Sequence, residues 1–417
     1  MLNSYLNPCN SKHSLVYSLS LINSMYPNLY YAFKDLFGVE WKFLRFVNSF
    51  GFFVAVAFII SAIVLANELR RKSKQGLFQP TEMQVMVGQP ATMLDLGLNF
   101  LLGFLLGFKI VALFIMDSSA TEDPQAFIFS TLGSWPAGIA LGLLFAGLKW
   151  WDKNKQKLAK PEKRTVRIWP HDRVGEITIL ALIFGLLGAK LFDIFENWSG
   201  FLKKPSDYIF SASGLTFYGG LICAALAIWW YAKKHKIGFW HLNDAMAPTM
   251  MLAYSLGRIG CQVAGDGDWG IPNTSPKPFS WLPDWMWSYT YPHNVNGDGL
   301  VKIPGCEGKF CNELEVGVFP TPFYEIVICF ILFLVIWSLR KKFKVPGTIF
   351  GFYLILNGLE RFFIEKIRVN TRLDIFGFHP TQAEVISTLL FLSGVGIWVF
   401  LVRKARKEKS TNAGTKA

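Results

Sequence analysis

The sequence predicts an all-α polytopic membrane protein with about nine transmembrane helices. Of its 417 residues, 52% are hydrophobic and 38 are Phe, whereas only 17% are charged. Soluble globular domains carry about 25% charged residues, and disordered chains combine low hydrophobicity with high net charge. The composition therefore excludes both classes. The net charge of +13 fits basic loops on one side of a membrane and does not by itself indicate nucleic-acid binding.

Nine segments carry the roughly 20 mainly apolar residues that a helix needs to cross a bilayer. In chain order they are Val47–Glu68, Leu96–Met116, Ile128–Trp150, Glu176–Ile194, Leu215–Ala232, Asp244–Val263, Phe323–Leu339, Gly347–Ile364 and Glu384–Val402. Residues 1–46 are aromatic and mixed, without the basic start and uninterrupted apolar stretch of a cleavable signal peptide. They are expected to form an interfacial or extracytoplasmic segment, because Tyr and Trp favour the membrane surface.

Lys and Arg concentrate in alternate loops. These loops are Arg70–Lys74, Lys149–Arg173, Lys233–Lys236, Arg340–Lys344 and Arg403–Lys409, whereas the opposite set is acidic or neutral, as in Asp117–Pro124. Basic loops stay on the cytoplasmic side. The pattern predicts an N-out, C-in, multi-pass membrane protein.

The predicted organisation is one transmembrane domain over residues 47–402, followed by a basic cytoplasmic tail at 403–417. A long extracytoplasmic loop, 265–320, is rich in Trp, Pro, Gly and Asp. Its Cys306 and Cys311 either form a disulfide, as the oxidising compartment allows, or remain free thiols.

Charged residues inside predicted spans indicate a functional site. Arg258 lies where the sixth span closes, and Arg361, Glu365 and Arg368 lie where the eighth closes. Arg361 and Glu365 share a helix face at i, i+4. By the predicted topology both groups face the outer leaflet. The alternatives are a structural ion-pair cluster that also involves Glu360, and snorkelling of Arg258 to the headgroups.

The third feature is the segment Ser213–Leu221, at the start of the fifth span. It contains the adjacent glycines Gly219 and Gly220. Adjacent glycines permit close approach of a ligand or of a neighbouring backbone, so helix packing by small residues is the alternative. Two arginines at one membrane face favour a phosphate ligand, because guanidinium binds phosphate through two parallel hydrogen bonds. The residues together predict a phospholipid headgroup site at the outer leaflet.

These segments resemble the prolipoprotein diacylglyceryl transferase family. The family signature G-R-x-G-N-F-x-N-G-E-x-x-G matches G-R-I-G-C-Q-V-A-G-D at Gly257–Asp266, and its H-G-G-L segment matches Tyr218–Leu221. Its Y-G-x-x-R-F-x-x-E-x-x-R segment matches Asn357–Arg368. Weaker matches, in the family's order along the chain, are Gly188–Phe192, Asp244–Pro248 and Pro320–Glu325.

Three departures from the family pattern stand out. Tyr218 replaces His, Cys261 replaces Asn, and Phe50 replaces Tyr. The family usually has seven spans, so residues 96–150 are predicted to be an inserted helical pair. An even number of extra spans preserves sidedness.

The resemblance implies transfer of the diacylglyceryl group from phosphatidylglycerol to the lipobox cysteine of a prolipoprotein. A thioether forms and glycerol phosphate leaves, which is the first step of lipoprotein maturation. The implied partners are phosphatidylglycerol and prolipoprotein signal peptides; no nucleic-acid partner is implied.

The implied roles follow the charge that develops on the departing phosphate. Arg258 and Arg361 are expected to stabilise it, with Asp266 and Glu365 as further catalytic residues. Tyr218 has an ordinary pKa near 10, which suits hydrogen bonding better than proton removal from the thiol. Headgroup binding is also expected at the positions Gly219, Gly220, Arg368, Tyr324 and Glu325.

No phosphate-binding Gly-rich loop and no zinc motif is found in the sequence, so no cofactor and no metal are predicted. Two other functions remain open. One is a non-catalytic phospholipid- or lipoprotein-binding relative, which the changes at Tyr218 and Cys261 would suit. The other is an anionic-lipid transporter, which would favour pseudo-symmetric halves and broken helices at mid-membrane.

Overall fold

The computed structural model describes residues 25–115, 127, 130–209, 214–296, 300–370, 372–374 and 377–414. Each of the nine predicted segments corresponds to a helix in this described part of the chain. These helices are α3 (Ser49–Lys74), α4 (Met93–Ile115), α6 (Trp135–Lys155), α7 (Val174–Glu196), α10 (Phe217–Lys234), α11 (Phe239–Ala264), α12 (Thr321–Leu339), α13 (Thr348–Glu365) and α14 (Gln382–Gly414). The acidic loop at 117–124, the ends Met116 and Ile128 of the predicted spans, Ser213, and residues 1–24 and 415–417 lie outside the described residues.

Five of these helices are long and apolar enough to cross a membrane. They are α3, α4, α7 with the turn before it, α12 and α14 up to Glu408. The protein is therefore a mainly helical, multi-pass membrane protein. The crossing of the bilayer by α6, α10, α11 and α13 stays a prediction.

Shorter elements connect the long helices. They are α2 (Leu29–Phe37), η1 (Lys42–Phe46), η3 (Pro170–Arg173), α8 (Trp198–Lys203), α9 (Pro205–Ile209) and η4 (Asp284–Met286). Two antiparallel ribbons are also present: β1 (Thr81–Val87) pairs with β2 (Glu162–Ile168), and β3 (Leu300–Lys302) pairs with β4 (Asn312–Leu314). The chain is mainly helical, as the sequence predicted, but the sequence did not predict these two short ribbons.

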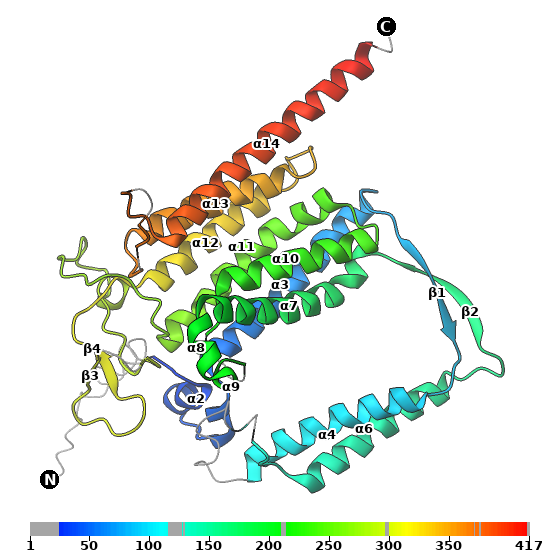
Figure 1. Cartoon of the computed structure of the whole chain (residues 1–417), viewed down its shortest axis with the longest axis horizontal. Helices are drawn as coiled ribbons and strands as arrows, with labels where there is room; N and C mark the ends of the chain where they lie inside the picture. Colours follow the sequence, from blue (N-terminus) through cyan, green and yellow to red (C-terminus); the bar gives the residue numbers. More distant parts are fainter. Residues whose placement is uncertain are drawn as a thin grey trace, which may run out of the picture. The chain divides into compact units, whose positions relative to one another are not determined.

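The chain divides into two compact units. One comprises residues 1–61 and 243–417, and the other comprises residues 62–242. Figure 1 shows the helices of each unit and the ribbon β1–β2, which leads to α4 and α6.

In three helix pairs, glycines lie at the contact between the two helices. A Cβ on Gly107 of α4 would lie 2.4 Å from the Ala137 carbonyl oxygen of α6. A Cβ on Gly219 of α10 would lie 2.6 Å from the Gly188 carbonyl oxygen of α7, and Gly394 of α14 is similarly close to α13. Helices in lipid gain little from apolar burial, so close backbone packing between small residues holds such pairs together.

Helix α6 begins later than predicted. The prediction started the third span at Ile128, but the helix starts at Trp135. The described residues before it form a turn because Lys109, inside α4, donates hydrogen bonds from Nζ to the carbonyl oxygens of Phe127, Ser130 and Leu132. The turn satisfies a cation that would otherwise face apolar surroundings.

In the long loop, backbone hydrogen bonds like those between β-strands join the ends of three helices. Gly270 donates to the Phe319 carbonyl oxygen at 2.8 Å, and Ile271 donates to the Ile367 carbonyl oxygen at 2.8 Å. The loop after α11 therefore lies between the segment before α12 and the turn after α13. Elsewhere in the loop Cys306 and Cys311 form a disulfide, which decides between the two states that the sequence left open.

Asp244 of α11 caps the start of α13. Its carboxylate accepts from the Gly347 amide at 2.7 Å and from the Phe350 amide at 3.0 Å. The side chain is buried, and a carboxylate at a helix N-terminus satisfies amides that have no partner within the helix.

We expect Asp244→Ala to lower the free energy of unfolding by about 2 kcal/mol, because both amides lose a charged acceptor. Asp244→Asn, which keeps one acceptor oxygen, should lose less. Thermal unfolding of the detergent-solubilised protein measures this, with the exposed Asp35→Ala as the control. Equal melting of Asp244→Ala and Asp35→Ala would contradict the capping role.

Candidate functional site

Three arginines and three carboxylates meet where α11, α12 and α13 approach the long loop. We call this set the arginine cluster; it consists of Arg258, Arg361, Arg368, Glu325, Asp268 and Glu365. All six belong to one compact unit. The sequence predicted every member except Asp268, and the structure brings the five predicted members together.

Glu325 of α12 is the centre of the cluster. Its oxygens lie 2.8 Å from Nε of Arg258, 3.1 Å from Nη1 of Arg361 and 3.5 Å from Nη1 of Arg368. Tyr254 also donates its hydroxyl proton to Glu325, at 2.8 Å. The Glu325 side chain is 0% exposed. This buried anion thus compensates cations from α11, α13 and the turn after α13.

Asp268, in the loop after α11, is the second bridge. One carboxylate oxygen pairs with Arg258, and the other lies 2.6 Å from Nη2 of Arg368. Burial by itself would raise the pKa of Asp268, but the two arginines outweigh it and lower the pKa to about 2. Thr321 fixes the backbone here by donating to the Asp268 carbonyl oxygen at 2.8 Å.

Asp266, which the sequence put forward as the acidic residue of this motif, forms none of these ion pairs. It accepts a hydrogen bond from the Asp268 amide at 3.3 Å. Partial exclusion of water and the neighbouring charge of Asp268 raise the pKa of Asp266. The motif G-D-G-D-W-G offers two acids two positions apart, and spacing alone did not identify which of them meets the arginines.

The face of α13 adds the third carboxylate. Glu365 lies 3.1 Å from Nη2 of Arg361, as the i, i+4 spacing predicted, and accepts from the Asn370 side chain at 2.5 Å. The buried Glu360 has no hydrogen-bond partner for either oxygen among the described residues. Glu360 therefore lies near the cluster without closing an ion pair there.

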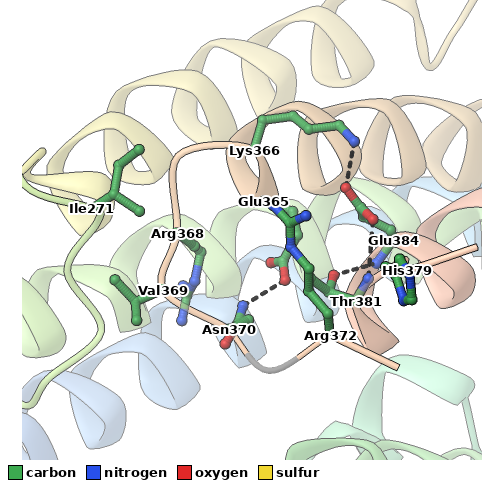
Figure 2. A pocket seen from close by; sticks show the side chains of 10 residues that line it. All are labelled: Ile271, Glu365, Lys366, Arg368, Val369, Asn370, Arg372, His379, Thr381 and Glu384. Carbon is green, nitrogen blue, oxygen red and sulfur yellow. Dashed lines mark hydrogen bonds and ion pairs between the residues drawn. The ribbon is translucent and has the colours of Figure 1, made fainter. Parts of the chain in front are cut away.

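A cavity of about 360 Å³ adjoins the cluster on the side of the turn after α13. Figure 2 shows Glu365, Arg368, Asn370, Arg372 and His379 around it. Arg368 is the link, because its side chain lines the cavity and also pairs with Asp268 and Glu325. The cavity therefore places space for an anionic group beside one guanidinium group of the cluster.

The remaining predicted residues have structural partners. Tyr324 donates its hydroxyl proton to the Met286 carbonyl oxygen at 2.8 Å. Gly219 and Gly220 are buried against α7, so helix packing accounts for both glycines. Tyr218 is half-buried in the first turn of α10. These three residues of α10 belong to the other compact unit, and their role in headgroup binding stays a prediction.

One group of potential metal ligands is found among the described residues. The ligand atoms of Cys261, Asp266 and Asp268 lie within 4.8 Å of one another. Asp268 already pairs with two arginines, and structural zinc sites take four ligands. We therefore assign no metal to this group.

A family model described as prolipoprotein diacylglyceryl transferase matches residues 134–400. The chain belongs to this family. The matched range contains the whole arginine cluster and every predicted site residue, whereas α3 and α4 precede it.

Curated relatives carry the name phosphatidylglycerol–prolipoprotein diacylglyceryl transferase. A relative from Dehalococcoides mccartyi is 28% identical over 289 residues, which cover 68% of this chain and 96% of that protein. One from Leptospira interrogans is 30% identical over 219 residues, or 46% of this chain and 61% of that protein. One from Pseudomonas aeruginosa is 26% identical over 247 residues, or 58% and 82%.

The two acids of the motif give a matched test. We expect Asp268→Asn to lower the free energy of unfolding by about 1–2 kcal/mol, because it weakens charged hydrogen bonds to two arginines. Asp266→Asn should change it by less than about 0.5 kcal/mol. Chemical unfolding in detergent measures both, and a larger effect of Asp266→Asn would show that the assignment of the bridging acid is wrong.

The pH dependence follows from the lowered pKa of Asp268. A carboxylate whose pKa falls from an ordinary 3.8 to about 2 on folding stabilises the folded state above pH ~4 and loses that effect as the pH falls towards 2. The stability difference between the parent and Asp268→Asn should therefore be constant from pH ~5 to ~9. A difference that titrates near neutral pH would contradict the ion pairs.

Proposed function

We propose that this chain transfers the diacylglyceryl group of phosphatidylglycerol to the lipobox cysteine of prolipoproteins. The observation that carries the proposal is the arginine cluster: three guanidinium groups gather at one end of α11 and α13 in a chain of this family. A phosphodiester is the abundant anion of a phospholipid headgroup, and arginine binds phosphate through paired hydrogen bonds.

The charge balance of the cluster supports a role in which phosphate enters as an additional anion. Three arginines face three carboxylates, so the cluster is neutral with all six groups ionised. Arg368 still has donors that form no hydrogen bond with described residues. A phosphate that binds these donors draws Arg368 away from Glu325 and Asp268. Arg258 still pairs with both of these carboxylates, and Arg361 still pairs with Glu325.

The reaction forms a C–S bond and breaks a C–O bond. The cysteine thiolate attacks the glyceryl carbon, and glycerol phosphate leaves with the electron pair of the broken bond. Negative charge grows on the phosphate as that bond breaks, so Arg258 and Arg361 bind the transition state more tightly than the lipid. The thiol proton passes to a base or to the departing phosphate.

Asp266 is the carboxylate of the motif that remains outside the ion pairs, and its pKa is raised. A base with a raised pKa is better matched to a thiol than an ordinary carboxylate. We therefore assign proton acceptance to Asp266 or to the phosphate itself, and hydrogen bonding to Tyr218. Glu365 and Glu325 act as positioning residues for the arginines.

The proposed topology has nine spans with the N-terminus outside and the C-terminus inside. Helix α14 continues from its apolar part into Arg403, Lys404 and Arg406, and the ends of α3, α6 and α10 are also basic. Basic ends stay in the cytoplasm, which directs the arginine cluster towards the outer leaflet of a bacterial inner membrane. Phosphatidylglycerol and the signal helix of the prolipoprotein both enter from the bilayer.

A transfer assay tests the proposal. Protein in nanodiscs containing phosphatidylglycerol should convert a lipobox peptide into a diacylglyceryl adduct that mass spectrometry detects. Arg258→Ala and Arg361→Ala should each lower the rate by about 10²–10³-fold, as for other donors to a developing anion. The exposed Arg403→Ala is the control. A folded parent protein that binds lipid without modifying the peptide would establish a non-catalytic relative.

Tyr218→Phe tests the role of the residue that replaces the family's His. If Tyr218 only binds the headgroup, loss of its hydroxyl should raise KM by about five- to tenfold, the cost of one hydrogen bond, with kcat little changed. Steady-state kinetics with varied phosphatidylglycerol measure both constants. A loss of kcat greater than a hundredfold at saturating lipid would instead make Tyr218 the base.

A further inference from the structure

The ribbon β1–β2 has two chemically different faces. Residues directly opposite in an antiparallel pair share a face, and the faces alternate along each strand. Met83 pairs with Val166, and Thr81 pairs with Ile168, on the same side as Val85 and Val87. The polar members of this apolar face are Thr81 at the near end and, towards the far end, Arg164 and Glu162, which pair with each other at 3.3 Å.

The other face is mainly polar. Glu82 and Arg167 lie opposite each other and form an ion pair of 3.2 Å. Next to them Gln84 lies opposite Thr165, and Met86 lies opposite Lys163. The pairing register therefore makes the ribbon amphipathic. No segment of the described chain covers its apolar face, because Met83 is 44% exposed and Val166 is 43% exposed.

An isolated two-stranded ribbon is at best marginally stable in water. Apolar side chains at alternate positions on one exposed face accordingly require a partner surface. Natural proteins often place charged side chains on exposed strands to prevent pairing with other chains, and on the apolar face of this ribbon such charges are confined to Arg164 and Glu162.

Both ends of the ribbon are tied to basic helix ends. At the near end Thr81 donates its hydroxyl proton to the His235 carbonyl oxygen at 3.2 Å, just after the basic end of α10. At the far end the Leu158 amide donates to the Gly88 carbonyl oxygen at 3.2 Å, just after the basic end of α6. Basic ends of spans lie on one side of the membrane. Two such anchors, one at each end, keep a ribbon of about 23 Å beside that surface.

We propose that the apolar face of the ribbon lies on the cytoplasmic surface of the bilayer and binds anionic lipid there. The apolar side chains enter the interfacial layer, while Glu82 and Arg167 face water. Charge complementarity identifies the occupant, because four lysines precede β2 within a few residues and attract anionic headgroups. They are Lys153, Lys155, Lys157 and Lys160. The long Arg164 side chain reaches the headgroups from the apolar face by snorkelling.

This inference rests on the proposed spans and sidedness and not on transferase activity. In the sequence, β1 lies between α3 and α4, and β2 lies between α6 and α7. Both strands are distant in the sequence from every residue of the arginine cluster. A protein that transfers no lipid would still show the lipid contact, so failure of one proposal is distinguishable from failure of the other.

Labelling of single cysteines by a charged maleimide tests the lipid contact. Val85→Cys and Val166→Cys report on the apolar face, and the adjacent Gln84→Cys and Thr165→Cys are matched controls on the polar face. In nanodiscs containing phosphatidylglycerol we expect the apolar-face cysteines to react at least about tenfold more slowly than the controls. The parent chain, with its own cysteines, gives the background rate.

A second comparison identifies the partner. Replacement of Lys153, Lys155, Lys157 and Lys160 by Gln, or of phosphatidylglycerol by phosphatidylcholine, should reduce the difference between the two faces to about threefold or less. Equal labelling of both faces in anionic nanodiscs would overturn the proposal. Protection of the apolar face that persists unchanged in phosphatidylcholine nanodiscs would also overturn it, because the cover would then not depend on anionic lipid.

Discussion

The buried carboxylate of Glu325 is the interaction on which the rest of the site depends. Three arginines cannot gather in apolar surroundings unless an anion compensates them, because the cost of burying an unpaired charge is several kcal/mol. Glu325 meets guanidinium groups from α11, α13 and the turn after α13. The same ion pairs thus hold three helices together, which is the structural role that the sequence left open, and we propose that they also form the phosphate site.

Much of this arrangement could be predicted from local sequence. Apolar length identified each long helix, and the i, i+4 spacing identified the pair Arg361–Glu365. The bridging role of Asp268 was not predictable, because it depends on a crossing in which the loop after α11 pairs with the turn after α13. Such long-range pairing leaves no period in the sequence. The cap that Asp244 provides to α13 escaped prediction for the same reason.

The ribbon β1–β2 shows a related limit of sequence patterns. Thr81–Val87 and Glu162–Ile168 are each short, and 74 residues, 88–161, separate them. Alternation over seven residues is a weak signal beside the long apolar runs on either side. The register becomes evident only when the strands pair, and pairing then reveals the two faces. The helices α4 and α6 were predicted as two spans. The packing role of their glycines, however, is evident only from the contact of Gly107 with Ala137.

The ribbon also gives a physical reason why two additional helices are compatible with this family's site. Thr81 pairs with Ile168, so the chain leaves towards α4 and returns from α6 at the same place. An excursion whose ends are hydrogen-bonded together changes little in the elements before and after it, since α7 begins only a few residues beyond Ile168. In the proposed topology, two helices within such an excursion return the chain to the side from which it departed. In that topology each arginine of the cluster keeps the sidedness that it would have without the proposed inserted pair, and the pair can acquire surface contacts of its own while the ion pairs around Glu325 remain intact.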